Sequence, residues 1–278
     1  MNPSAHAVDL NGVGALTHPE RPALLAAPRT ASAAAIKLFW LWTLFWWGGV
    51  GVFAGLFYFG VLDFATSTKI PLYGISIWLN GCLWAWLKQT RDQRTSQDII
   101  HDGLVIWMLS YALTNLLWEI PWLVCSPFVF QDLHSLDDVV AHTEFMRSNL
   151  GNMYWWILAS FSAVDLRTVN HNPTFYTLEI YAFVNLASTF YFFYLNKKRS
   201  PYRYLIPILS CGEPVASTFI FSFSEVMDGF RNMPGGTADT LLALVWTQYQ
   251  YVLFPLLFAT LSVKLFLHDM NQATRTAP

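Results

Sequence analysis

Six long apolar stretches restrict this chain more than any other feature does. A helix needs about 20 predominantly apolar residues to cross the hydrocarbon core of a bilayer. Six stretches meet this requirement: Ile36–Leu62, Ile70–Leu87, Gly103–Cys125, Thr174–Leu195, Tyr204–Phe223 and Leu241–Leu267. Because backbone groups in lipid must pair within their own segment, each stretch predicts a helix. The sequence therefore predicts an all-α, multi-pass transmembrane bundle of about six spans.

The composition agrees with a surface that faces lipid. Only 12% of the residues are charged and 54% are hydrophobic, whereas a soluble domain carries roughly 25% charged residues. The net charge of −2 offers no basic face, so no nucleic-acid partner is expected. The three cysteines are dispersed and give neither a disulfide framework nor the spacing of metal ligands.

The chain divides into four parts. Residues 1–35 are polar and rich in Ala and Pro, which predicts a disordered cytosolic tail. Residues 36–95 hold two transmembrane helices, residues 96–270 form the main transmembrane domain, and residues 271–278 are a second tail.

One apolar stretch, Met153–Phe161, is too short to cross and is interpreted as an interfacial or re-entrant segment. The alternative is a seventh span, which would put the two termini on opposite sides. The segment belongs to a long acidic loop, Ser126–Pro173, and a loop of this length is usually a lid or a site wall.

Basic residues set the orientation, because cytoplasmic loops retain Lys and Arg. With six spans, one side receives Arg21, Arg29, Lys88, Arg91, Arg94, Lys197, Lys198, Arg199, Arg203 and Arg275. The other side receives only Lys69, Arg147, Arg167 and Arg231. The pattern predicts that both termini lie in the cytosol.

Three carboxylates, Glu119, Glu179 and Glu213, interrupt the apolar stretches. A charge at the centre of a span costs about 2.5–3.5 kcal/mol on translocon scales, so each needs a reason. The simpler interpretation is a polar contact between helices, worth about 0.6 kcal/mol on average. Glu119 and Glu179 have no partnering Lys or Arg in their stretches, which favours a functional role, while both interpretations stay open for Glu213.

Other polar and aromatic residues lie beside these carboxylates. Asn115 and Glu119 are four residues apart and would share one face of an α-helix. Pro121 would free a carbonyl close to them. In the last stretch, Gln248 and Tyr251 are three apart and would also share a face. Aromatic rings beside a carboxylate, such as Trp118 and Trp122, are suited to cation–π contacts.

Several segments from the third span onward match, in order and spacing, the motifs of a known protein family. They are Ala112–Glu119, Asp165-Leu166-Arg167 fourteen residues before Glu179, the acidic stretch Ser224–Phe230, and the residues Gln248, Tyr251 and Pro255. Together these segments resemble the emopamil-binding protein family, the sterol Δ8–Δ7 isomerases and relatives that share the EXPERA domain. The chain departs from the family where Asn115 replaces a His, Tyr251 a Trp and Thr218 an Asp.

The resemblance implies a five-helix EXPERA-like core with an extra N-terminal helix. It also implies that Glu119 and Glu179 are the two carboxylates of the pocket. The pocket should be walled by spans three to six, with the first two spans packed outside it. In a eukaryotic host the expected location is the endoplasmic reticulum membrane.

The expected function is a cofactor-free intramembrane isomerase that moves a double bond in a sterol, steroid or terpenoid. A carboxylic acid in an apolar pocket can protonate an alkene, and a second carboxylate can face the resulting carbocation. Glu179 is the expected proton-transferring group and Glu119 its partner. Asn115 and Gln248 would orient them, and the other expected substrate-binding residues are Trp118, Trp122, Glu213, Thr218 and Tyr251.

Two alternatives stay open: a membrane terpenoid cyclase with the same acid chemistry, and a non-enzymatic sterol-binding protein. In each case the expected partners are a hydrophobic small molecule and the lipid bilayer. Homodimer formation is also left open.

Overall fold

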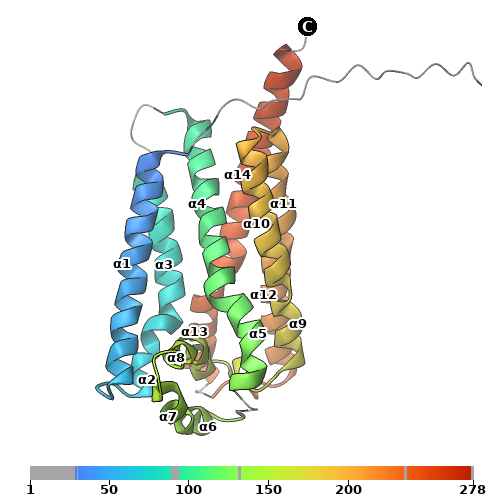
Figure 1. Cartoon of the computed structure of the whole chain (residues 1–278). Helices are drawn as coiled ribbons and strands as arrows, with labels where there is room; N and C mark the ends of the chain where they lie inside the picture. The colour runs from blue at the N-terminus through green and yellow to red at the C-terminus, as the bar shows by residue number, and fades with distance from the viewer. Residues whose placement is uncertain (1–28, 30, 89–93, 131–132, 235–236, 277–278) are drawn as a thin grey trace, which may run out of the picture.

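The computed structural model describes residue 29 and residues 31–88, 94–130, 133–234 and 237–276. These residues form helices and turns (Figure 1). The α-helices are α1 Ala33–Tyr58, α2 Phe64–Ser67, α3 Lys69–Lys88, α4 Ser96–Thr114, α5 Ile120–Val129, α6 Leu136–Ala141, α7 Thr143–Arg147, α8 Met153–Ala159, α9 Pro173–Glu179, α10 Tyr181–Lys197, α11 Leu205–Ser210, α12 Gly212–Met227, α13 Thr237–Gln248 and α14 Gln250–Thr276. A π-turn spans Asn115–Glu119, and 3₁₀ turns span Ser160–Ala163, Leu166–Thr168 and Pro201–Tyr204.

The prediction of an all-α bundle with six spans is confirmed. In the described part of the chain, six helical runs are long and apolar enough to cross a membrane: Ala33–Tyr58, Phe64–Lys88, Ser96–Val129, Pro173–Lys197, Pro201–Met227 and Val245–Gln272. Helix α8, in the stretch predicted to be interfacial, has only seven residues. The multi-pass architecture therefore follows from the apolar stretches, as expected.

Two predicted tail boundaries were wrong. Helix α1 begins at Ala33, inside the predicted tail, and α14 continues to Thr276, through most of the second one. Alanine has the highest helix propensity, so the residues Ala33–Ala35 extend α1, and polar residues extend α14 because helical hydrogen bonds do not require apolar side chains. Residues 1–28 of the first tail lie outside the described residues.

The spans pack side by side (Figure 1). Helix α1 packs on α3, α3 on α4, and α4 on both α10 and α14. Helices α11 and α12 pack on α14 and complete the bundle. The short helices α2, α6, α7 and α8 lie together at one end, which we call the loop end (Figure 1).

The third span is one helical run interrupted by the π-turn. The N–H of Ile120 bonds to the carbonyl of Asn115, five residues back. Pro121 has no N–H to offer the carbonyl of Leu117, and the hydroxyl of Tyr154 in α8 donates to that carbonyl instead. Burial raises the pKa of the Tyr154 phenol to about 12, so it keeps its proton at neutral pH. The freed carbonyl that Pro121 predicted is therefore present, and the long loop binds it.

The same loop is fastened to the first two spans. Arg147 donates from Nε to the carbonyl of Phe57 at 2.8 Å and from Nη2 to that of Leu62 at 3.0 Å. Trp156 stacks on Phe57 and donates to the hydroxyl of Ser67 at 2.8 Å. The predicted lid or wall is thus a packed layer across the loop end.

A buried cluster of charges joins the helices at the opposite end. Asp269 of α14 accepts from Arg29 and, at 3.4 Å, from Arg203. Arg203 also donates to the hydroxyl of Tyr204 at 2.8 Å, and that hydroxyl lies 3.3 Å from Nδ1 of His101. The cluster ties Arg29, four residues before α1, to α4 and α14.

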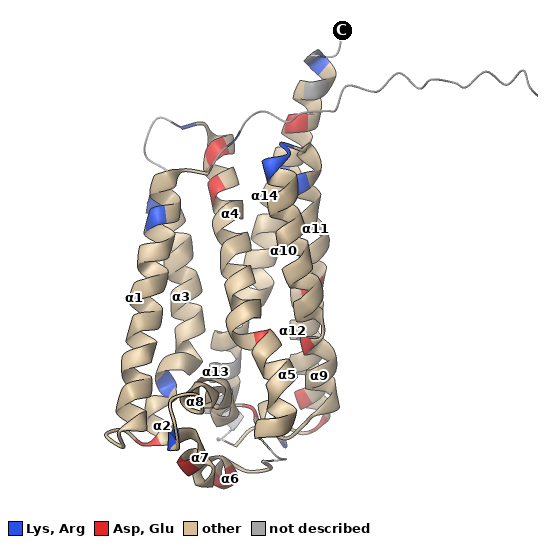
Figure 2. Ribbon diagram, in the orientation of Figure 1, with Lys and Arg blue, Asp and Glu red and all other residues tan. Residues whose placement is uncertain are grey.

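The orientation in the membrane gives a testable prediction. Helix α4 begins and α10 ends at the end opposite α6 (Figures 1 and 2). Reporter fusions at Arg94 and Lys198 should therefore give a cytosolic signal, because basic residues are retained on that side. A fusion at Asp138 in α6 should report the other side, and a cytosolic signal from it would refute the orientation.

Candidate functional site

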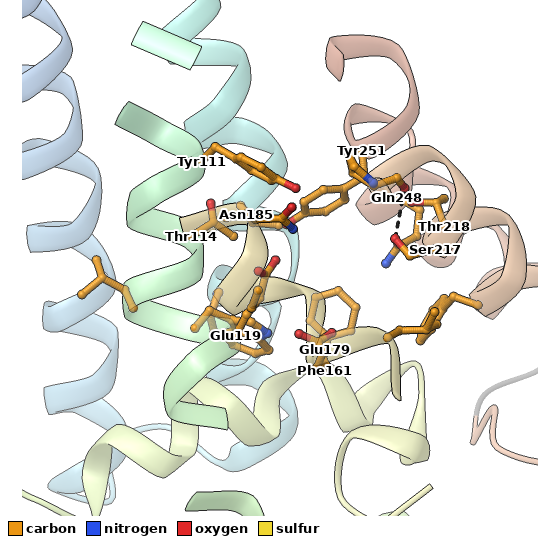
Figure 3. A pocket seen from close by; sticks show the side chains of 18 of the residues that line it. Tyr111, Thr114, Glu119, Phe161, Glu179, Asn185, Ser217, Thr218, Gln248 and Tyr251 are labelled. Atoms are coloured by element: carbon orange, nitrogen blue, oxygen red, sulfur yellow. Dashed lines mark hydrogen bonds between the residues drawn. The ribbon is translucent and has the colours of Figure 1, made fainter. Parts of the chain in front are cut away.

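A cavity of about 130 Å³ lies between the spans. Its polar lining consists of Tyr111, Thr114, Glu119, Glu179, Asn185, Glu213, Ser217, Thr218, Gln248 and Tyr251 (Figure 3). Its aromatic lining includes Trp46, Trp47, Trp118, Phe161, Phe175 and Phe221. No Lys, Arg or His is among the described residues that line it. The described lining is therefore mostly apolar and aromatic, and its charged groups are acidic.

Three carboxylates from three different spans meet in this cavity. Glu119 comes from the π-turn, Glu179 from the last residue of α9, and Glu213 from the first turn of α12. Figure 3 shows Glu119 and Glu179 pointing into the same space. Each of the three carboxyl groups lies close enough to the other two for their charges to interact. The structure thus brings together the carboxylates that the sequence singled out.

The carboxylates differ in how they are held. Oε2 of Glu213 accepts hydrogen bonds from Tyr111 at 3.1 Å and from Asn185 at 2.7 Å. The side chains of Glu119 and Glu179 accept none from the residues that the structure describes. Glu213 is therefore fixed in orientation, while Glu119 and Glu179 are available to a ligand.

Asn115 does not line the cavity, so its predicted role is wrong. It is fully buried and donates to the carbonyl of Tyr111 at 2.7 Å. The prediction assumed an α-helix, in which residues four apart share a face. The π-turn adds a residue to this turn, so Thr114 and Glu119 face the cavity instead.

Trp122 also lies outside the cavity, although Trp118 lines it. The ring of Trp122 packs edge-on against Phe175, with centroids 4.5 Å apart, and its Nε1 donates to the carbonyl of Thr168 at 2.8 Å. Trp122 therefore supports the wall from behind, and the prediction that it contacts substrate is wrong.

Gln248 and Tyr251 line the cavity as predicted, but not from one continuous helix. Helix α13 ends at Gln248 and α14 begins at Gln250. Gln248 makes no side-chain hydrogen bond to Glu119 or Glu179 in the described structure, so the orienting donors that are present are Tyr111 and Asn185 on Glu213. Thr218 lines the cavity beside Ser217.

The first two spans do not pack outside the site, which corrects another expectation. Six lining residues come from them: Trp46, Trp47 and Val50 of α1, and Pro71, Gly74 and Ile75 of α3. The expectation rested on a resemblance that begins at the third span. A cavity between tightly packed helices takes its wall from every neighbour, and α3 packs directly on α4.

Two segments that carried the resemblance meet beneath the cavity. Arg167 donates to Asp165, with its Nη2 2.5 Å from Oδ2, and its Nε lies 3.2 Å from Glu225 Oε1. Its Nη1 donates to Ser224 at 2.7 Å, and its guanidinium lies 4.0 Å from the ring centre of Phe221. Since Phe221 lines the cavity, this buried cluster supports the wall.

Burial also affects the pKa of Asp165, one of the two acids in that cluster. It raises the pKa of the Asp165 carboxyl above its ordinary value, against the opposing effect of the hydrogen bonds from Arg167. The second oxygen of Glu225, Oε2, is buried without a hydrogen-bond partner in the described structure. The cluster thus holds two buried carboxylates against one guanidinium.

Sequence reasoning missed Tyr111, Thr114, Asn185 and Ser217 in the polar lining. Asn185 carried a usable signal, since it is a polar amide in an apolar stretch, as Asn115 is. Ser, Thr and Tyr are common in membrane helices, so the other three carried none. Among the described residues, no group of His, Cys, Asp and Glu is arranged to hold a metal ion.

Comparisons of the chain with protein-family models, with curated proteins and with solved structures found no match.

Proposed function

We propose that this protein is a cofactor-free intramembrane isomerase that moves a carbon–carbon double bond in a sterol, steroid or terpenoid. The observation that supports it best is the cavity itself, in which three carboxylates and several aromatic rings face one space and no described lining residue is basic. The proposal keeps the resemblance to the emopamil-binding protein family, with Glu119 and Glu179 in the positions of its pocket carboxylates.

The first step needs an acid. The protonated carboxyl of Glu179 gives its proton to one alkene carbon, and the two π electrons form the new C–H bond. The neighbouring carbon becomes a carbocation and Glu179 a carboxylate. Carboxyl groups that share an apolar site cannot all ionise readily, so one of them retains a proton at neutral pH.

The second step needs a base and a stabilised cation. A carboxylate, Glu119 in our assignment, removes a proton from the carbon on the far side of the cation, and the C–H electrons form the shifted double bond. Glu119 then gives up this proton to water and Glu179 takes one from water, so the site is restored and no proton is consumed overall. Glu213, held by Tyr111 and Asn185, supplies a fixed negative group toward the cation.

The aromatic lining suits a cationic intermediate. Trp118 of the third span and Tyr251 of the last span present rings to the cavity, and Trp46 and Trp47 present rings from the first span. Aromatic faces attract a cation without bonding to it, and a predominantly apolar lining limits the access of water that would hydrate it.

The second candidate is a terpenoid cyclase. Rings that enter the cavity from several spans favour it, because a cyclisation moves positive charge over several carbons and needs a face near each. The proton donor would be the same.

An experiment in heavy water separates the candidates. Membranes that contain the protein are incubated in D₂O with host lipids, and the extracted sterols and terpenoids are compared with those from membranes that contain Glu179→Gln. Isomerisation should give a product of unchanged ring number with one deuterium from solvent, and cyclisation one deuterium and an added ring. A lipid profile identical to that of the variant would remove both enzymatic candidates.

A further inference from the structure

The first two spans form the side of the cavity that carries most of its indole rings. Trp46 and Trp47 of α1 line the cavity together with Gly74 of α3. The described carboxylates all come from later spans, Glu119, Glu179 and Glu213. The described residues that the hairpin α1–α3 contributes to the cavity are therefore all uncharged.

Two tryptophans of α1 are seated on glycines of α3. A Cβ atom at Gly74 would come within 2.8 Å of Cζ2 of Trp46, and one at Gly81 within 2.1 Å of Cε2 of Trp42. Trp42 is held by a hydrogen bond to the carbonyl of Trp78 at 2.9 Å. The two pairs are alike in build, but only Trp46 and Gly74 line the cavity.

The wall is fixed relative to the opposite side of the cavity. Ser76 of α3 donates to the carbonyl of Trp246 at 2.9 Å, and Asn80 of α3 donates to the hydroxyl of Tyr249. These contacts lie at the break between α13 and α14, which positions Gln248 and Tyr251. Helix α3 thus contacts both α1 and the break between α13 and α14, so the fold sets the distance between these two sides of the cavity.

We propose that Trp46, seated on Gly74, is a specificity-determining residue that limits the size of the ring system admitted between the hairpin and the carboxylates. The proposal rests on the proposed function only for the identity of the substrate class. A Cβ atom at position 74 must displace the Trp46 ring. Because both residues line the cavity, this displacement changes the shape of the cavity.

The size of the cavity makes such a limit effective. Its volume of about 130 Å³ is close to that of an engineered cavity of about 150 Å³ that accepts one benzene ring. A larger ligand therefore places only part of its ring system here. In a hydrophobic pocket, one methylene group changes selectivity by roughly 10–200-fold, so displacement of an indole ring should be readily measured.

The test measures binding of three amines of increasing ring number: cyclohexylamine, 2-aminodecalin and 3-aminocholestane. An ammonium group is attracted by the carboxylates, and the alicyclic body meets the wall. The full-length protein is placed in phosphatidylcholine nanodiscs, with empty nanodiscs as the blank. Gly74→Ala should weaken binding of the four-ring amine relative to the one-ring amine by about tenfold or more, and Trp46→Ala should shift this ratio in the opposite direction.

Gly81→Ala is the matched control. It crowds Trp42 more closely than Gly74→Ala crowds Trp46, so it should lower stability at least as much. It should nevertheless shift the binding ratio much less than Gly74→Ala does, because Trp42 does not line the cavity and reaches it only through its contact with the Trp46 ring, with centroids 5.9 Å apart.

Three results would overturn the proposal: ratios unchanged in Gly74→Ala and Trp46→Ala, an equal shift in Gly81→Ala, or no binding of any amine by the wild type. If Gly74→Ala does not fold, the ratio of four-ring to one-ring amine binding in Trp46→Ala and Trp46→Leu tests the proposal instead. Failure of the proposed function would appear differently, as absent turnover together with shifted binding ratios.

Discussion

Glu179→Gln should abolish most turnover while the protein still folds and binds its substrate. The amide has the shape of the carboxyl group but cannot donate its proton to an alkene. Loss of a general acid typically costs about 10²–10⁴-fold in rate. The measurement is the rate of product formation in membranes, normalised to the amount of folded protein and compared with substrate binding by the same variant.

Glu144→Gln provides the control, because Glu144 is exposed in the loop, outside the cavity. It should turn over as the wild type does. Glu119→Gln should also be severe, since it removes the base and a negative charge that faces the cation. Normal turnover in both Glu119→Gln and Glu179→Gln would exclude the paired-acid mechanism and leave the binding interpretation.

Arg167→Met should destabilise the fold by about 3–5 kcal/mol, because it leaves buried carboxylates without their cation. Asp165 and Glu225 are both at most 1% exposed, so water cannot replace the guanidinium. The methionine keeps much of the volume against Phe221, which limits the effect to charge and hydrogen bonding. Thermal unfolding of the purified protein in detergent measures the loss.

Arg231→Met is the matched control at the same end of the molecule. The Arg231 side chain is 82% exposed and lies 3.9 Å from Asp228, so its removal should change stability little. The loss in Arg167→Met should shrink at acidic pH. The pKa of Asp165 is already raised by burial, so this acid takes up a proton as the pH falls and relieves the unpaired charge. Equal melting of the two variants would contradict the role given to Arg167.

The spans could be predicted from sequence because lipid imposes a simple requirement. A run of about 20 apolar residues has few alternatives to a helix in a bilayer. The gathering of Glu119, Glu179 and Glu213 was also within reach, since unpaired acids in such runs turn toward a protein interior. Both inferences depend on what lipid excludes rather than on the details of packing.

Packing decided what the sequence did not predict. Trp122 resembled a cavity residue by its position near Glu119, yet it packs behind Phe175. Trp46 gave no signal in a stretch already rich in tryptophan, and it lines the cavity because α1 packs on α3 and α3 on α4. Which face of a lipid-exposed helix turns inward depends on its neighbours, and the apolar character of α1 does not mark one face.

The π-turn has a consequence for any alignment of this chain. A π-turn contains one residue more than the α-helical turn it replaces, as a single-residue insertion would produce. An ungapped alignment to a continuous α-helix therefore stays in phase on only one side of Asn115–Glu119, and it pairs Asn115 with a position that Thr114 occupies in space. Removal of one residue here would leave a helix of regular pitch and keep the orientation of α5, because the π-turn accommodates the extra residue without turning the helix that follows it. Relatives of this chain that lack the extra residue would thus need a gap within Asn115–Glu119, and their residue in front of this gap would align with Thr114, which lines the cavity.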